Sequence, residues 1–402
     1  MPTYKYKVMD HKGQKIEAIF KANSKNEVLA MIEDNNYYPI EIKEVLEREQ
    51  KDLFESFEKV KTKDLYIFCR QFYTMINAGA NIANALDVLK KQTENKKLKK
   101  SLYEVHDDLQ KGVSLSDSLS KHKDVFPDLL INMINTGEVS GNLDTIMNRM
   151  ASHFEKENKI NNQLKSAMVY PMVLGCLSVV IVIFLLTFIM PTFTGMFTSS
   201  GVALPAPTRI IMGISQFIQT KWYILIAVIG GAIYGMKSYV KTPQGRLSID
   251  GLKLKLPIIK DITEKAIVSR FTRTLSTVIA SGVPLVQALE VVQKVVGNKV
   301  AENALEKIKE KVVRGVSLAE ALGVEAIFPE MLHSMIKIGE ESGSLDDILD
   351  KTANFYDEEL ETSLKKMTTM IEPLMIIVMG VIIGFIVIAM MLPIFDMTKT
   401  VQ

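Results

Sequence analysis

The sequence predicts a mainly α-helical polytopic membrane protein, with two duplicated six-helix-type bundles expected in the cytoplasm, three transmembrane helices and a small α/β N-terminal domain. Two long uncharged stretches interrupt a chain of 402 residues, of which 23% are charged. A pattern of residues recurs about 203 positions later. The expected division is N-terminal domain 1–50, linker 51–63, first repeat 64–167, first span 168–191, external loop 192–220, second span 221–240, linker 241–261, second repeat 262–370, third span 371–394 and external tail 395–402.

The first fifty residues carry the pattern of a small α/β domain. Tyr4, Tyr6 and Val8 alternate with polar residues, which is typical of a half-buried strand. The expected elements that follow are a turn at Asp10–Gly13, a strand at Ile16–Lys21, a helix at Ser24–Asn35 and a strand at Tyr38–Glu44.

Two stretches are long and apolar enough to cross a bilayer as helices. A helix rises 1.5 Å per residue, so about 20 apolar residues cross about 30 Å of hydrocarbon. Met172–Met190 and Leu374–Leu392 meet this requirement, and each has a proline just outside both of its ends. A shorter stretch, Trp222–Met236, spans only if Lys221 and Lys237 extend toward the two headgroup layers.

An internal duplication indicates how many times the chain crosses the membrane between its two copies. Arg70 matches Arg273 and Gly79 matches Gly282 at an offset of 203, and Gly-Glu-x-Ser-Gly-x-Leu-Asp occurs at 137–144 and again at 339–346. Each copy is therefore a helical block followed by a span. Two copies of one block belong on the same side of the membrane, which requires an even number of crossings between them and so favours the short second span.

The distribution of Lys and Arg predicts the orientation. Lysines precede the first and third spans and follow the second, whereas 191–221 carries only Arg209 and Lys221. By the positive-inside rule, the N-terminus and both helical blocks are cytoplasmic and the C-terminus is outside.

Local signals indicate about six helices per block. Gly79 and Gly282 are typical of residues that follow a helix end, and Ser114 and Ser317 of helix N-caps. Asn142 and Ser344 are also expected as N-caps. Tyr66, Phe68 and Phe72 are interpreted as core residues.

Composition excludes several functions. A net charge of +2 argues against a nucleic-acid partner. The five histidines are scattered and predict no metal site. We find no phosphate-binding G-x-x-x-x-G-K-[ST], no H-E-x-x-H and no G-x-S-x-G, so we expect no enzyme, catalytic residue or cofactor.

These motifs resemble those of the platform proteins of type IV pilus and type II secretion machines (the PilC/GspF family). The resemblance covers almost the whole chain. It rests on the paired Gly-Glu-x-Ser-Gly-x-Leu turns, Tyr170-Pro171 before span one, and Glu372-Pro373-Leu374 with 392–395 (Leu-Pro-Ile-Phe) around span three.

The resemblance implies a non-enzymatic scaffold in the cytoplasmic membrane that couples a hexameric ATPase to the insertion of pilins or pseudopilins into a filament. Other implied partners are further inner-membrane components, the lipid bilayer and other copies of the chain. The platform of a DNA-uptake pseudopilus is an alternative. A repeat-built transporter or a membrane enzyme would be a different class, but the duplicated part is expected outside the membrane and no active-site set is visible.

The candidate interface residues are Arg70, Gly79, Glu138, Gly141, Arg273, Gly282, Glu340, Gly343 and Glu372. Glu138 and Glu340 either cap a neighbouring helix or pair with a nearby basic residue, or they contact the ATPase or a second subunit. A metal shared by Glu138 and Asp144 is a further interpretation, although two carboxylates alone are a weak ligand set, since calcium takes six to eight oxygens.

Three further features have two interpretations each. Glu372, at the mouth of span three, contacts the helix bundle or a pilin segment, or lies at headgroup level. Gly231-x-x-x-Gly235 and Gly380-x-x-x-Gly384 predict pairing of spans two and three, within or between chains, or occur by chance. The lysines at 96–100 contact anionic lipid or the ATPase, or form a solvated helix face.

Overall fold

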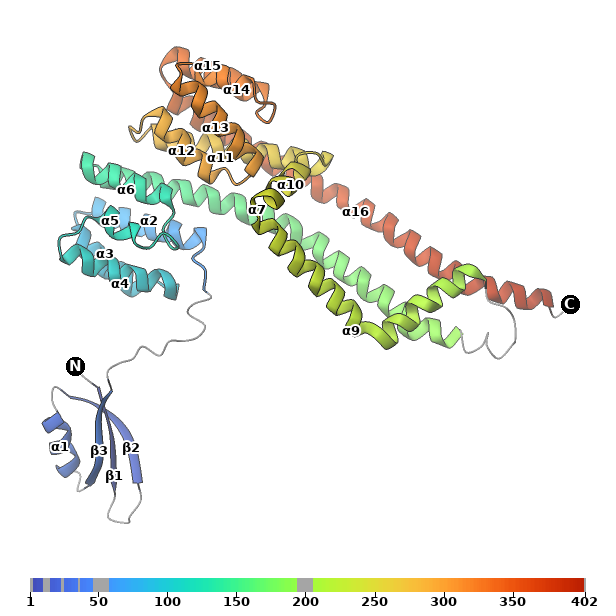
Figure 1. Ribbon diagram of the computed structural model, residues 1–402, viewed down its shortest axis with the longest axis horizontal. Coiled ribbons are helices and arrows are strands. Elements are labelled where there is room, and N and C mark those ends of the chain that lie inside the picture. The colour runs from blue at the N-terminus through green and yellow to red at the C-terminus, as the bar shows by residue number, and fades with distance from the viewer. Residues whose placement is uncertain are drawn as a thin grey trace.

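The computed structural model describes residues 3–9, 15–22, 25–34, 37–45, 58–193 and 205–400, and Figure 1 shows the arrangement of its elements. The turn expected at Asp10–Gly13 and most of the linker expected at 51–63 lie outside the described residues. The described part of the N-terminal unit contains three strands and one helix, as expected. These are β1 (Thr3–Met9), β2 (Lys15–Lys21), α1 (Lys25–Asp34) and β3 (Tyr38–Val45).

The sheet of this unit is antiparallel with the order β2-β1-β3. Tyr4 and Val8 of the central strand are buried against Val28 and Ile32 of α1. The expected alternation of Tyr4, Tyr6 and Val8 is therefore explained, because every second residue of a strand faces the helix.

Both repeats contain the same succession of six helices, which confirms the duplication. In the first repeat these are α2 (Thr62–Asn77), α3 (Ile82–Gln92), α4 (Lys96–Gln110), α5 (Leu115–Ser120), α6 (Asp128–Ser140) and α7 (Leu143–Phe184). In the second they are α11 (Pro257–Ile279), α12 (Leu285–Val295), α13 (Lys299–Val313), α14 (Leu318–Gly323), α15 (Glu330–Ser342) and α16 (Leu345–Thr400).

The sixth helix of each repeat continues into a membrane span without a break. The helix α7 has 42 residues, and a π-helical segment, η2 (Leu185–Ile189), extends it. The helix α16 has 56 residues. Pro171 and Pro373 lie inside these helices, directly before the apolar stretches, so each helix continues through its proline into the span. A proline inside a helix removes one backbone hydrogen bond and bends the helix. A long helix tolerates this because its many other backbone hydrogen bonds remain.

Among the described residues, three helices are long and apolar enough to cross a membrane, within 143–193, 206–241 and 345–392, which agrees with the three expected spans. The second of these, α9 (Ala206–Lys241), begins earlier than expected, because 206–220 is helical rather than an external loop. The backbone of Lys221 is non-helical and separates this first part from the second span.

Tertiary contacts hold the first part of α9 against the far ends of the other two spans. The hydroxyl of Thr208 donates to the backbone oxygen of Ala389 (2.5 Å), and that of Ser215 donates to the backbone oxygen of Leu186 (2.5 Å). Ile211 is buried between them. The segment therefore bridges spans one and three.

The linker expected at 241–261 is also largely helical. It contains α10 (Pro243–Lys253), whose first turn is capped by Thr242, and the beginning of α11. Asp250 of α10 is buried and accepts a hydrogen bond from the backbone nitrogen of Lys299 (2.9 Å), so α10 packs on the start of α13.

Within each repeat, the first helix packs antiparallel to the sixth. In the second repeat, Ser276 contacts Asp346 at the start of α16 (Oγ to the backbone oxygen, 3.0 Å), whereas Asp261 contacts Ser363 farther along (2.5 Å). The core of the repeats includes Phe68 and Phe72, as expected, whereas Tyr66 is only partly buried.

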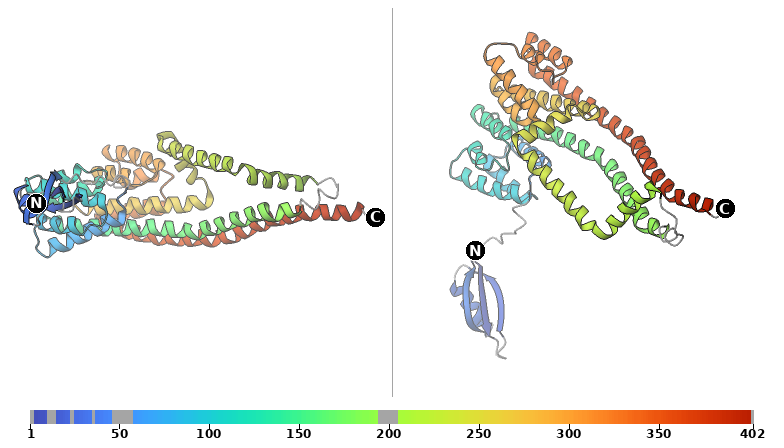
Figure 2. Two further views of the ribbon diagram at one scale, coloured as in Figure 1. Left: turned by 90° about the horizontal axis from the view of Figure 1, so that it is seen from below. Right: turned by 45° about the vertical axis from the view of Figure 1, so that its right-hand side comes forward.

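The helices α7 and α16 run side by side in the same direction (Figure 2). Lys156 donates to Asn354 and Gln163 donates to Glu361, each at 2.8 Å and each with a separation of 198 residues. A constant separation is the signature of parallel helices. Both repeats therefore lie at the same end of the molecule, and both spans leave it in the same direction.

Candidate functional site: paired turns and the joint between the repeats

Glu138 and Glu340 each bind the start of a short helix of their own repeat. The carboxylate of Glu138 accepts hydrogen bonds from the backbone nitrogens of Leu115 (2.6 Å) and Ser116 (2.9 Å) and from the hydroxyl of Ser116 (2.5 Å). Glu340 accepts from the backbone nitrogens of Leu318 (2.7 Å) and Ala319 (2.9 Å). A carboxylate at this position satisfies free N–H groups and lies at the positive end of the helix dipole. The geometry therefore corresponds to the capping interpretation.

The expected serine caps occupy the same helix starts. The hydroxyl of Ser114 accepts from the backbone nitrogen of Asp117 (3.1 Å), and that of Ser317 accepts from Glu320 (3.2 Å). The helices α5 and α14, of six residues each, thus have two caps apiece. Asn142, expected as an N-cap, precedes α7 but makes no side-chain cap bond.

The candidate glycines stand at turns that require a left-handed backbone. Gly79 and Gly282 follow the first helix of each repeat with φ of 89° and 85°, and Gly141 and Gly343 end α6 and α15 with φ of 73° and 68°. Residues with a Cβ rarely adopt these angles. These four glycines therefore shape the turns.

Gly137 and Gly339 were missed as candidates. A Cβ on Gly137 would lie 3.1 Å from the Cα of Leu143, and one on Gly339 would lie 3.1 Å from the Cα of Leu345. The missing side chain lets the helix before the turn approach the helix after it. The first glycine of the repeated Gly-Glu-x-Ser-Gly motif was the signal that could have identified them.

Arg70 and Arg273 connect the first and sixth helices of their repeats to different extents. Arg70 binds Asn148 (3.2 Å) and Glu155 (2.8 Å), and the side chains of this ion pair are 37% and 52% exposed. Arg273 is almost fully buried; its Nη2 lies 2.6 Å from Asp357. It also binds Asp350 (3.4 Å) and Asn354 (3.1 Å).

Arg273 also belongs to the joint between the repeats. His153 of α7 is buried beside it, and together with Thr274 they line a cavity of about 10 Å³, the size of about one water molecule. Both ring nitrogens of His153, Nε of Arg273 and the hydroxyl of Thr274 have no hydrogen-bond partner among the described residues. Burial, reinforced by the charge of Arg273, lowers the pKa of His153 to about 4.

Acid is expected to weaken the fold through His153. Its pKa lies below the ordinary value of about 6.5 that the unfolded chain retains, so the unfolded chain binds the proton first as the pH falls. The loss begins near pH 6.5 and reaches about 2 kcal/mol at pH 5. Burial raises the pKa of the neighbouring Glu157, although the charge of Arg270 acts in the other direction. This shift makes the folded chain bind a proton more readily than the unfolded chain, so it opposes the loss of stability that His153 causes in acid.

Thermal unfolding of the wild type and of His153→Gln at neutral pH and at pH 5 measures the contribution of His153 alone. The variant should lose less stability on acidification. An equal loss in both proteins would show that His153 does not titrate in this range.

Glu372 is exposed on α16 and lies near α7. It interacts with the hydroxyl of Tyr170, the residue at the matching position of the first repeat. The glycines of the two G-x-x-x-G motifs, in contrast, make no close packing: a Cβ on Gly231, Gly235, Gly380 or Gly384 would meet no atom within 4 Å among the described residues. Pairing of spans two and three through these glycines within one chain is therefore not seen, and pairing between chains stays a prediction.

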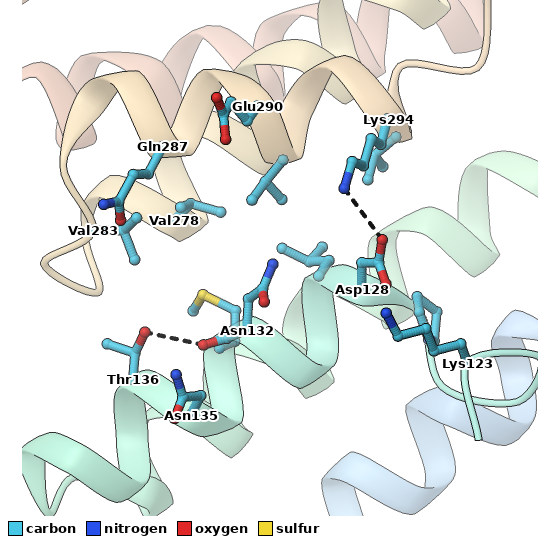
Figure 3. A pocket seen from close by; sticks show the side chains of 15 residues that line it. Lys123, Asp128, Asn132, Asn135, Thr136, Val278, Val283, Gln287, Glu290 and Lys294 are labelled. Atoms are coloured by element: carbon cyan, nitrogen blue, oxygen red, sulfur yellow. Dashed lines mark hydrogen bonds and ion pairs between the residues drawn. The ribbon is translucent and has the colours of Figure 1, made fainter. Parts of the chain in front are cut away.

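A groove of about 670 Å³ separates α6 of the first repeat from α12 of the second (Figure 3). Asp128 and Lys294 form an ion pair across it (3.4 Å), with Asn132 and Thr136 on one side and Gln287 and Glu290 on the other. Across the described ranges, no group of three or more His, Cys, Asp or Glu side chains has the arrangement of a metal site. The two Cys residues are unpaired, and Cys69 is buried.

Comparison with known proteins gives full-length matches. The family described as "Type II secretion system (T2SS), protein F" matches 68–191 and 271–393, which are the two repeats with spans one and three, and the N-terminal domain of the same family matches 1–43. "Type IV pilus assembly protein PilC" of Thermus thermophilus is 39% identical over 100% of both chains. PilC of Pseudomonas aeruginosa is 36% identical over 86% of this chain and 92% of its own.

A protein of a secretion machine also matches along its whole length. "Type II secretion system protein F" of Vibrio cholerae is 30% identical over 99% of both chains. The duplicated helical repeats, the three apolar helices and these matches agree along the whole chain. The chain therefore belongs to the type II secretion system protein F and type IV pilus PilC family of non-enzymatic membrane platform proteins.

Proposed function

We propose that this chain lies in the cytoplasmic membrane and couples a hexameric cytoplasmic ATPase to the movement of pilins or pseudopilins between the membrane and a filament. The observation that carries the proposal is the continuity of α7 and α16 from the repeats into the spans. The names of the relatives, which refer to pilus assembly and to secretion, support the kind of machine.

The continuous helices can transmit a displacement of the repeats to the membrane spans. At 1.5 Å per residue, the 42 residues of α7 extend over about 63 Å and the 56 residues of α16 over about 84 Å. No loop interrupts either helix between repeat and span, so a displacement of a repeat moves the span with it. Contacts between α7 and α16, such as Gln163 with Glu361, make the two helices move together.

The charge distribution supports repeats and N-terminus in the cytoplasm and the C-terminus outside. Lys159 and Lys165 of α7 and Lys365 and Lys366 of α16 lie on the repeat side of the spans. Such residues favour the cytoplasmic side. The bridging segment 206–220 carries one charged residue, Arg209, and lies at the other side.

Cysteine labelling in intact cells tests this orientation. Lys111→Cys and Arg314→Cys, at matching positions of the two repeats, should be protected from a membrane-impermeant thiol reagent, whereas Arg209→Cys should react. Cys176 is first replaced by Ala, and Cys69 is buried. Labelling of only one of the two repeat positions would contradict the shared side.

Co-purification from crosslinked membranes tests the coupling. The tagged chain should retain an ATPase and pilins or pseudopilins, and the filament proteins found would distinguish pilus, secretion and DNA-uptake machines. Recovery of neither class of protein would contradict the proposal.

A further inference from the structure

The first part of α9, residues 206–220, presents three different faces along one helix. We call these residues the bridging segment. Thr208, Ile211 and Ser215 form its packing face, because they are buried against spans one and three. Most of the other side chains of the segment are exposed, so spans one and three cover only part of its surface.

The exposed surface divides into an apolar stripe and a polar stripe. Ile210, Ile214 and Phe217, which are 59%, 47% and 40% exposed, recur at the spacing of one helix face and form the apolar stripe. The polar stripe consists of three exposed residues, Arg209, Gln216 and Thr220. At 3.6 residues per turn the polar stripe lies about 100° around the helix from the apolar stripe. A helix with separate polar and apolar faces is typical of a membrane interface.

The two anchors of the bridging segment lie at nearly the same depth. Its hydroxyl contacts reach Ala389 of α16 and Leu186 of α7, which are 203 residues apart. Tyr170 and Glu372, which interact across the same two helices, are 202 residues apart. Because α7 and α16 run in the same direction, the two anchor points are level to within a few ångströms. The segment therefore crosses from span three to span one at one level, and Figure 1 shows α9 turning back toward the repeats after this crossing.

This level is the far edge of the apolar stretches. Leu186 lies four residues before Met190, and Ala389 lies three residues before Leu392, where the two stretches end. At the helical rise these separations correspond to about 6 Å and about 4.5 Å. An interfacial helix buries its apolar face about 5–10 Å into the boundary between headgroups and acyl chains. The bridging segment therefore lies at the depth that such a helix occupies.

This boundary is the environment that suits both stripes. In water the three apolar side chains would be exposed to solvent, and in the hydrocarbon the charge of Arg209 would be costly. At the boundary the polar stripe faces headgroups and water while the apolar stripe faces acyl chains. The spans also expose large apolar side chains at this level, such as Phe188 and Ile388, so lipid is the neighbour that the surrounding surface fits.

We propose that the bridging segment is an interfacial helix of the leaflet remote from the repeats. Ile210, Ile214 and Phe217 insert among the acyl chains of the phospholipids, and the polar stripe faces headgroups and water. Lipid and the hydroxyl contacts of Thr208 and Ser215 together hold spans one and three side by side at this surface. The proposal rests on the membrane insertion of the spans and does not depend on the coupling to an ATPase.

Spin labels on the full-length protein in phospholipid nanodiscs test this placement. Cys176 is first replaced by Ala, and Cys69 is buried. Single cysteines are then introduced along both stripes, as Ile210→Cys, Ile214→Cys, Phe217→Cys, Arg209→Cys, Gln216→Cys and Thr220→Cys. The ratio of accessibility to oxygen, which concentrates in lipid, over accessibility to a water-soluble nickel chelate should be about fivefold higher on the apolar stripe. Ile226→Cys in the second span and Lys111→Cys in the first repeat give the lipid and water references.

Three patterns of accessibility would overturn the proposal. Equal access of the nickel chelate to both stripes would place the apolar stripe in water. A high oxygen ratio at all six positions would place the whole segment in hydrocarbon. An apolar stripe that is shielded from both reagents would indicate a protein contact, such as a second copy of this chain, instead of lipid.

A matched pair of charged variants tests whether lipid contact stabilises the protein. Ile214→Asp should lower the melting temperature in nanodiscs, because it places a carboxylate among acyl chains. Gln216→Asp adds the same residue to the polar stripe of the same helix and should leave the melting temperature unchanged. Equal changes in the two variants, whether large or absent, would contradict the insertion of the apolar stripe into lipid.

Discussion

Arg273→Ala is expected to lower the free energy of unfolding by about 3 kcal/mol, because it leaves a half-buried carboxylate without its cation. Arg273 is 8% exposed, and its Nη2 lies 2.6 Å from Oδ2 of Asp357, whose side chain is 19% exposed. After the substitution, Asp357 retains a hydrogen bond from Ser269 but no ion pair among the described residues. The change also removes the polar contacts that hold α11 against Asp350 and Asn354 of α16.

Arg70→Ala is the matched control, because the duplication places the same residue in the same helix of the first repeat. Its ion pair with Glu155 is much more exposed, and exposed pairs contribute about 1 kcal/mol or less. Thermal unfolding of both variants in the same detergent gives the comparison, with Arg273→Lys expected to be intermediate because it keeps the charge but loses the fork of donors. Equal losses at the two positions would show that burial does not set the strength of this contact.

The parts of the fold that sequence predicts correctly depend on local chemistry or on composition. The apolar stretches identify spans because lipid accepts few charges. Helix ends are identified by residues that complete a turn or a cap within a few positions, namely Gly79, Gly282, Ser114 and Ser317. The duplication then links elements that are 203 residues apart without any structural information.

The parts that sequence misses depend on contacts between distant residues. The segment 206–220 is helical and lies across the spans because of two distant contacts. The hydroxyl of Thr208 donates to the backbone oxygen of Ala389, 181 residues away, and that of Ser215 donates to the backbone oxygen of Leu186 in the π-helical segment. The pairing of Lys156 with Asn354 follows a separation of 198 residues, not the 202 of the duplication, so the repeat pattern alone cannot predict the joint.

The candidate site illustrates the same division. Glu138 and Glu340 were identified from a motif, but their partners lie 21 to 23 residues upstream, where no local spacing indicates a contact. Glu372 was identified from its depth at the span, and only the packing of α7 on α16 brings Tyr170 to it.

Glu138→Ala is expected to lower the free energy of unfolding by about 2–3 kcal/mol, and Glu340→Ala by about 2 kcal/mol. Glu138 accepts three hydrogen bonds at the start of α5, and Glu340 accepts two at the start of α14. A helix of six residues is too short to be stable alone, so the loss of the carboxylate also frees the helix from the turn that holds it.

Hydrogen exchange locates the effect. In Glu138→Ala the amides of Leu115 and Ser116 should exchange faster than in the wild type, and Glu138→Gln, which keeps one acceptor oxygen, should be intermediate. Glu341→Ala is the control, since the side chain of Glu341 is 68% exposed and its contact with Lys337 is at 4.0 Å. If Glu138→Ala and Glu340→Ala instead keep wild-type stability and exchange but lose filament assembly, the two carboxylates serve a partner. The capping contacts would then add little to the fold, because a carboxylate that stabilises α5 or α14 cannot be removed without loosening the helix it caps.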